Sequence, residues 1–112
     1  MSIHVLLIFA SLIWTHFLAD FLLQSHEMSC NKSKSNFWLG LHCYVYILPF
    51  LWVGVQFAII TGLLHFLVDY GTSRATSRLW QAQETHWFFV VIGFDQAAHL
   101  TFLLGTYALL AA

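Results

Sequence analysis

Histidine and aspartate recur four residues apart inside apolar stretches of the sequence. His16 precedes Asp20 in H-F-L-A-D, and His65 precedes Asp69 in H-F-L-V-D. Residues at this spacing lie on one face of a helix, so each pair would present an imidazole and a carboxylate in one direction. Imidazole nitrogen and carboxylate oxygen are common ligands of zinc and related cations. The two pairs therefore predict a metal site.

A third pair has the opposite order, and a further histidine stands alone. Asp95 precedes His99 in D-Q-A-A-H, and His42 lies in another apolar stretch. If neighbouring helices alternate in direction, the reversed order places the carboxylate on the same side of its imidazole in all three pairs. We therefore expect one layered site that draws on every helix. The expected metal ligands are His16, Asp20, His42, His65, Asp69, Asp95 and His99.

Three carboxylates inside apolar segments need a common explanation. An ionised carboxylate near the centre of a bilayer costs at least about 2.5 to 3.5 kcal/mol, and a bound divalent cation offsets that cost. Zinc is the favoured ion. The ligand set exceeds what one tetrahedral ion needs, so two ions, or one ion with carboxylates that orient the imidazoles, both stay open. Hydrogen-bonded pairs that join helices without a metal are the alternative interpretation.

The composition indicates which elements position these side chains. Of the 112 residues, 60% are hydrophobic and only 8% are charged, whereas soluble domains have about 25% charged residues. A spanning helix needs about 20 apolar residues. We therefore predict an all-α fold, a single transmembrane domain over residues 1–112, with about four spanning helices. Their expected ranges are residues 3–24, 37–51, 57–70 and 86–110, with loops at 25–36 and 71–85.

The basic residues predict the orientation of this bundle. All four lysines and arginines lie in the two expected polar loops. Cytoplasmic loops carry an excess of Lys and Arg, and four spans put both loops on one side. We expect that side to be cytoplasmic and both termini to face outward. A net charge of −1 with four basic residues excludes a nucleic-acid partner.

Several other polar residues have candidate roles near the site. Gln24 continues the helix face of His16 and Asp20, and Gln96 follows Asp95. Both are candidates for binding substrate or for hydrogen bonds to the ligands, as is Lys32 in the first polar loop. Tyr46, four residues after His42, is expected to hydrogen-bond into the cluster. The spacing of the two cysteines, Cys30 and Cys43, predicts no disulfide.

The same residues carry a family resemblance. The segments H-F-L-A-D-F-L-L-Q, N-K-S-K, L-H-C-Y-V-Y, L-L-H-F-L-V-D and D-Q-A-A-H-L occur in that order. Together they resemble the small bacterial and phage membrane proteins grouped as domain of unknown function 3307, over nearly the whole chain. The resemblance implies a bacterial inner-membrane location and no particular activity. The positions that match are His16, Asp20, Gln24, Lys32, His42, His65, Asp69, Asp95, Gln96 and His99.

Three functions remain open at this point. The first is a metal-dependent membrane hydrolase, which a looser likeness to membrane-bound metal-dependent hydrolases favours. Zinc lowers the pKa of a bound water to roughly 7, and Asp95 or Asp20 would be the catalytic base. The substrate would be a lipid, a lipid-linked phosphate or a membrane peptide, reached from the cytoplasmic leaflet. The second is a structural metal protein, and the third is a proton or divalent-metal channel or transporter, which would need a homo-oligomer to form a pore.

Overall fold

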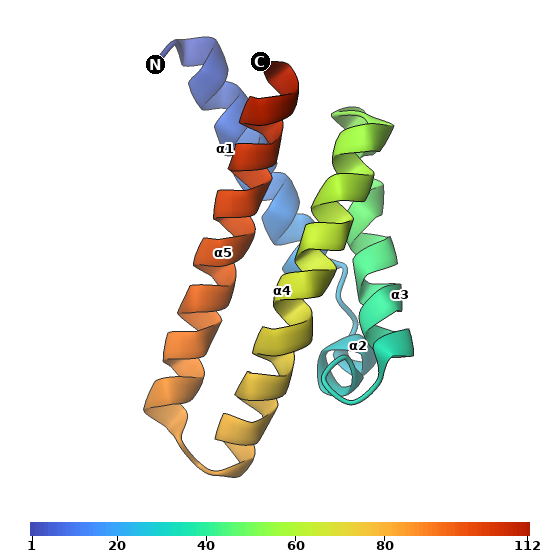
Figure 1. Cartoon of the computed structure of the whole chain (residues 1–112), viewed down its shortest axis with the longest axis vertical. Coiled ribbons are helices and arrows are strands. Elements are labelled where there is room, and N and C mark those ends of the chain that lie inside the picture. The colour runs from blue at the N-terminus through green and yellow to red at the C-terminus, as the bar shows by residue number, and fades with distance from the viewer.

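The computed structural model describes residues 1–112, all in helices and short connections. Helix α1 (Ile3–Phe17) begins at Ser2, whose hydroxyl accepts a hydrogen bond from the first turn. A π-helical turn, Leu18–Leu22, continues α1, and the short helix α2 (His26–Asn31) follows. Both termini lie at one end of the bundle, and α2 lies toward the other end (Figure 1). We refer to these as the terminal end and the α2 end.

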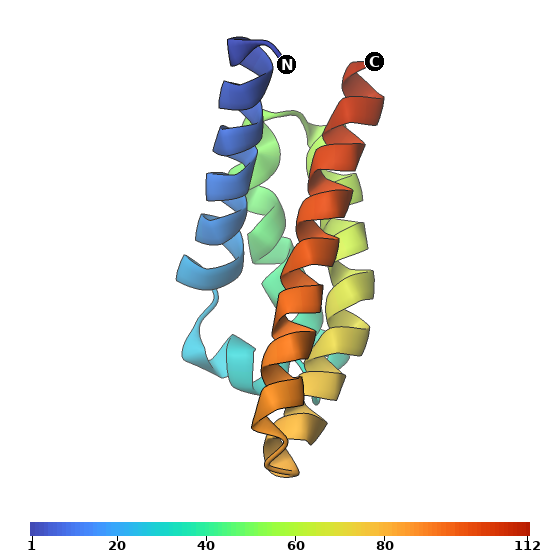
Figure 2. The same cartoon turned by 90° about the vertical axis from the view of Figure 1, so that its left-hand side faces the viewer.

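The second half of the chain folds into three further helices. Helix α3 (Asn36–Ile47) continues into a 3-10 segment, Leu48–Trp52. Gly54 makes the turn that follows, with a φ of +145°, a conformation that only glycine adopts without strain. Helices α4 (Val55–Gln81) and α5 (Thr85–Ala111) form a long antiparallel pair whose connection lies at the α2 end (Figures 1 and 2).

The helix boundaries differ from the expected ones at the α2 end. Helix α4 continues to Gln81 instead of ending at residue 70, so most of the expected loop 71–85 is helical. The other expected loop, 25–36, contains the short helix α2. The stretch has no proline, and the Thr72 hydroxyl bonds back to the Val68 carbonyl, so its polar side chains do not end the helix. With about 1.5 Å per residue, α4 is about 40 Å long and exceeds the thickness of a bilayer core of about 30 Å.

Three helices are long and apolar enough to cross a membrane. They are α1 with its π turn, α4 and α5. Helix α3 and its 3-10 segment are shorter and do not meet this criterion, so the structure supports three of the four expected spans. Helix α3 packs closely on α4, because Gly62 has no side chain and leaves room for Ile47.

The distribution of polarity is inverted relative to a soluble protein. Only 20 of the 112 residues are buried, and ten of these are polar or charged. Apolar side chains cover the outside, with Leu67 68% exposed and Leu109 80% exposed. Soluble proteins bury such side chains and rarely expose large apolar areas. The terminal half of the interior is filled by an apolar cluster of Leu12, Ala19, Tyr46, Phe50, Phe57, Ala58 and Leu103.

Candidate metal centre

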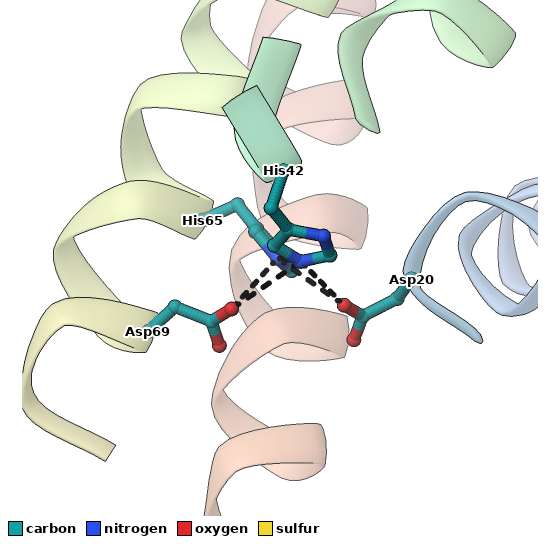
Figure 3. A group of neighbouring side chains, drawn as sticks. All are labelled: Asp20, His42, His65 and Asp69. Carbon is teal, nitrogen blue, oxygen red and sulfur yellow. Dashed lines mark hydrogen bonds and ion pairs between the residues drawn. The ribbon is translucent and has the colours of Figure 1, made fainter. Parts of the chain in front are cut away.

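Four buried ligand atoms from three helical segments converge in the middle of the bundle (Figure 3). The Nε2 atoms of His42 and His65 lie 3.0 Å apart. Asp20 Oδ1 lies 3.0 Å from the His42 nitrogen and 3.3 Å from the His65 nitrogen. Asp69 Oδ2 lies 3.4 Å and 3.3 Å from the same two nitrogens. We call Asp20, His42, His65 and Asp69 the central group.

The distances in the central group suit a tetrahedral cation. Bonds of about 2.0 to 2.2 Å to zinc give a tetrahedron whose edges are about 3.3 to 3.6 Å, near the separations observed. Hydrogen bonds within the group leave some of the close contacts unexplained, because carboxylate oxygens only accept and each imidazole Nε2 carries at most one hydrogen. Two hydrogens cannot serve five close contacts. A divalent cation satisfies all four atoms at once.

The charges around the central group also suit a divalent cation. Asp20, Asp69 and Asp95 are buried, and the Lys32 ammonium lies 3.0 Å from Asp69 Oδ2. With neutral imidazoles, three negative charges and one positive charge leave −2, which one divalent cation balances. Burial lowers the pKa of Lys32, but the charges of Asp69 and Asp20 outweigh it and raise the pKa above its ordinary value. Lys32 therefore remains charged.

Asp95 and His99 adjoin the central group on α5. His99 Nε2 lies 3.0 Å from Asp69 Oδ1 and 3.1 Å from Asp95 Oδ1. Ligand atoms of Asp20, Asp95 and His99 all lie within 4.8 Å of one another. The hydroxyl of Thr72 also hydrogen-bonds Asp95 Oδ1. Sequence reasoning missed Thr72, although its position three residues after Asp69 on a helix would have placed it on the same face.

His16 has a different position from the other histidines. Its Nδ1 is 2.8 Å from the Tyr46 hydroxyl and its Nε2 is 2.9 Å from Gln96 Oε1, so hydrogen bonds occupy both ring nitrogens. The separation from Asp20, its expected partner, is 3.7 Å. His16, one of the expected metal ligands, lies beside the central group rather than within it. Tyr46 bonds into the cluster as its spacing from His42 suggested.

Gln96 joins His16 to two of the carboxylates. Its amide nitrogen donates to Asp20 Oδ2 at 3.3 Å and to Asp95 Oδ2 at 3.1 Å. These two acceptors fix which end of the amide faces them, so Oε1 must accept from His16. With Nε2 of His16 donating, its Nδ1 accepts from the hydroxyl of Tyr46. One chain of hydrogen bonds thus orients both carboxylates.

Asp20 lies in the π turn. The amide of Leu23 bonds the Leu18 carbonyl at 2.9 Å, a spacing of five residues rather than four. From this turn Asp20 Oδ1 contacts His42 on α3 and His65 on α4, and Oδ2 lies 3.7 Å from His16. Single π turns are rare and occur frequently at functional sites. Nothing in the spacing of the apolar residues indicates this turn.

Ring stacking orients His65. Its ring lies 3.9 Å from the Tyr46 ring and 4.0 Å from the His99 ring, nearly parallel to both. The Nδ1 atoms of His42 and His65 make no hydrogen bond within the protein. Metal-binding histidines usually donate their second nitrogen to an acceptor. Here packing between flat rings holds the His65 imidazole instead.

A cleft of ≈ 690 Å³ reaches this cluster from the α2 end. All three carboxylates line it, together with Gln24, Lys32 and Gln96, which were the expected contacts of a substrate. On the other side of the cluster, a cavity beside His65 and His99 measures only ≈ 10 Å³. That space holds about one water. The three carboxylates therefore line the cleft at the α2 end and not the small cavity beyond His65 and His99.

Replacing Gln96 should destabilise the bundle. In Gln96→Leu, the His16 Nε2–H and two carboxylate oxygens lose their partner, and an unsatisfied buried group costs about 1 to 3 kcal/mol. We expect a lower thermal midpoint in detergent. Thr101→Val is the control, because the hydroxyl of Thr101 is exposed and bonds only its own helix. An unchanged midpoint for Gln96→Leu would show that the amide does not hold the carboxylates.

Comparison with known proteins identifies the family but no characterised relative. Residues 8–111 match the family described as "Protein of unknown function (DUF3307)". No curated protein and no solved structure is similar to the chain. The match includes every residue of the hydrogen-bonded cluster, and the chain belongs to the DUF3307 family.

Proposed function

We propose that this protein is a metal-dependent membrane hydrolase whose active site opens toward the cytoplasm. The observation that carries the proposal is the cleft, because Asp20, Asp69 and Asp95 all line it. A structural zinc site is closed by its four protein ligands, whereas a catalytic site leaves a position open to water and substrate. The central group supplies four protein ligands, as a structural site does, but it lies at the base of an open cleft, from which a water would bind as a fifth ligand.

The chemistry follows from the placement of the ligands. The central group would hold one divalent ion, zinc being favoured, and water would bind from the cleft as a further ligand. Asp95 lies outside the central group, with a carboxylate oxygen within 4.8 Å of the ligand atoms of Asp20 and His99. Asp95 also lines the cleft, so it would accept a proton from a water that enters there. Of the two expected catalytic residues, Asp20 becomes a ligand and Asp95 the general base.

The reaction is a hydrolysis with water as the second reactant. An ion held by the central group would supply Lewis-acid chemistry, which polarises a carbonyl or phosphoryl oxygen and activates water. The water oxygen bonds to the carbon or phosphorus, and the bond to the leaving group breaks. Asp95 returns the proton it accepted to the leaving group. Because the cleft lies between apolar helices, the substrate would be a lipid or a membrane-embedded peptide.

The active site faces the cytoplasm if α3 crosses the membrane with its 3-10 segment. The two segments together, Asn36–Trp52, reach the lower limit of about 17 residues for a span. Four spans put both termini on one side, as Figure 1 shows for the bundle. Lys32, Lys34, Arg74 and Arg78 all belong to the other end, which the positive-inside rule makes cytoplasmic. The membrane would be the bacterial inner membrane.

Thiol labelling tests this topology. Cys30 is exposed at the α2 end, whereas Cys43 is buried. A membrane-impermeant maleimide should label the protein in inverted membrane vesicles and leave it unlabelled in intact spheroplasts. Cys30→Ser is the control and should abolish labelling in both. Labelling of Cys30 in spheroplasts would place the cleft on the outer side and contradict the orientation.

The two alternative functions fit the structure less well. A protein with a purely structural metal has no need of a cleft lined by three carboxylates. A transporter needs a path on both sides of the site, but the cavity beyond His65 and His99 is only ≈ 10 Å³. The apolar cluster that includes Leu12 and Phe50 fills the interior beyond it.

Elemental analysis of detergent-purified protein tests the metal. We expect close to one zinc or similar ion per chain in the wild type. His65→Ala should retain little of it after dialysis, because the ion loses one of two nitrogen ligands. His4→Ala, an exposed histidine near the terminal end, is the matched control. Metal-free protein after zinc supplementation would end the hydrolase proposal, and two ions per chain would make Asp95 a ligand rather than a base.

Asp95→Asn separates catalysis from folding. The amide keeps the shape and accepts from Thr72 but takes up no proton, so turnover should fall by about 100-fold or more, the usual contribution of a general base. Metal content should stay close to wild type, and the thermal midpoint should fall only modestly, because the amide nitrogen replaces the oxygen that accepts from Gln96. Turnover is measured on a panel of carboxylic and phosphoric esters in mixed micelles, with Glu84→Gln as the exposed control. Loss of metal together with turnover would contradict the assigned role.

A further inference from the structure

A stripe of hydroxyl groups on α4 leads from the cluster to the mouth of the cleft. Thr72, Ser73, Thr76 and Ser77 line the cleft in the two turns that follow Asp69. Their spacing places them on one helix face. This stripe lies in the stretch that was expected to be a loop, so the sequence did not reveal it. The opposite wall carries Ser29, Ser33, Lys32 and Lys34.

Two polar groups in the cleft wall lack a partner. Ser73 is only 7% exposed, and its hydroxyl makes no hydrogen bond. The buried side-chain oxygen of Gln24, on the facing wall, also has none. By contrast, the hydroxyls of Thr72 and Thr76 bond within the protein. Unpaired buried polar groups are costly, so Ser73 and Gln24 indicate where a ligand supplies hydrogen bonds.

The charge at the cleft favours an anionic ligand. Lys34 is exposed, lines the cleft and forms no ion pair, whereas Lys32 is held by Asp69. Once a divalent cation has balanced the buried carboxylates, Lys34 is the charge left without a counterion. Hydroxyl and ammonium donors around a metal ion are the groups that bind the oxygens of a phosphate.

The outer part of the cleft is apolar. Phe21, Phe88, Phe89 and Ile92 line it alongside the hydroxyl stripe. Phe21 and Phe89 are exposed on the outside of the bundle as well, so the cleft is continuous with the surface that lipid would cover. A volume of ≈ 690 Å³ lies within the range of about 300 to 1,000 Å³ for ligand sites. The ligand therefore has a charged head and an apolar chain.

We propose that the cleft binds the phosphate ester headgroup of a membrane lipid. Ser73 and Lys34 would contact the phosphate, and the aromatic wall would contact the chain. Binding of the headgroup does not depend on the proposed function, but its hydrolysis does. In that reaction the water oxygen bonds to phosphorus, and the bond from phosphorus to the lipid oxygen breaks. The lipid oxygen takes the proton from Asp95. The products are the dephosphorylated lipid alcohol and phosphate.

Binding measured without turnover tests the headgroup assignment. Zinc-loaded Asp95→Asn protein in micelles is titrated with short-chain phosphatidic acid, with diacylglycerol of the same chains, and with inorganic phosphate. We expect phosphatidic acid to bind at least about tenfold more tightly than either. Equal binding of inorganic phosphate would assign the site to the free ion, and equal binding of diacylglycerol would show that phosphate is not recognised. Either result overturns the proposal.

Matched variants locate the phosphate. Ser73→Ala and Lys34→Gln should each weaken phosphatidic acid binding by about tenfold, the equivalent of one lost hydrogen bond to a charged group. Ser11→Ala and Arg78→Gln, which lie outside the cleft, should leave it unchanged. No effect of Ser73→Ala or Lys34→Gln would overturn the assignment. If the wild type binds phosphatidic acid specifically but does not hydrolyse it, the headgroup site stands and the hydrolase proposal is wrong. If the wild type hydrolyses neutral esters without a preference for phosphate, the hydrolase proposal stands and the headgroup site is wrong.

Discussion

The burial of three carboxylates inside an apolar bundle is the constraint on which the rest of the structure depends. Asp20, Asp69 and Asp95 come from different helices and would repel one another at such short range. Hydrogen-bond donors surround these carboxylates, namely the ammonium of Lys32, the amide of Gln96, the hydroxyl of Thr72 and the imidazoles. With neutral imidazoles these leave a residual negative charge, and the cation that we propose for the central group would remove it.

The same constraint explains the inverted distribution of polarity. An interior that carries donors and carboxylates has little room for apolar side chains, so the apolar core is confined to the terminal half. Leu67 and similar residues then cover the outside. In a bilayer this arrangement costs little, because lipid chains solvate leucine as well as a protein core does.

Sequence periodicity predicted where the site lies better than it predicted the geometry within the site. The spacing of His and Asp was enough to bring His42, His65, Asp20 and Asp69 together, because residues four apart share a helix face. It did not indicate that His16 lies outside the central group, nor the π turn at Leu18–Leu22, which leaves no signature in residue types. It also failed for α4 beyond Tyr70, where the polarity of Thr72 to Ser77 suggested a loop although no residue there ends a helix.

The origin of the ligands has a consequence for assembly in the membrane. Asp20 belongs to the π turn after α1, His42 to α3, and His65 with Asp69 to α4. No helical hairpin on its own contains a complete coordination sphere, so a partly inserted chain would hold an ion weakly and exchange it readily. Tight retention of the ion would then report that all of these segments have docked, and the centre would serve as an internal marker of completed folding.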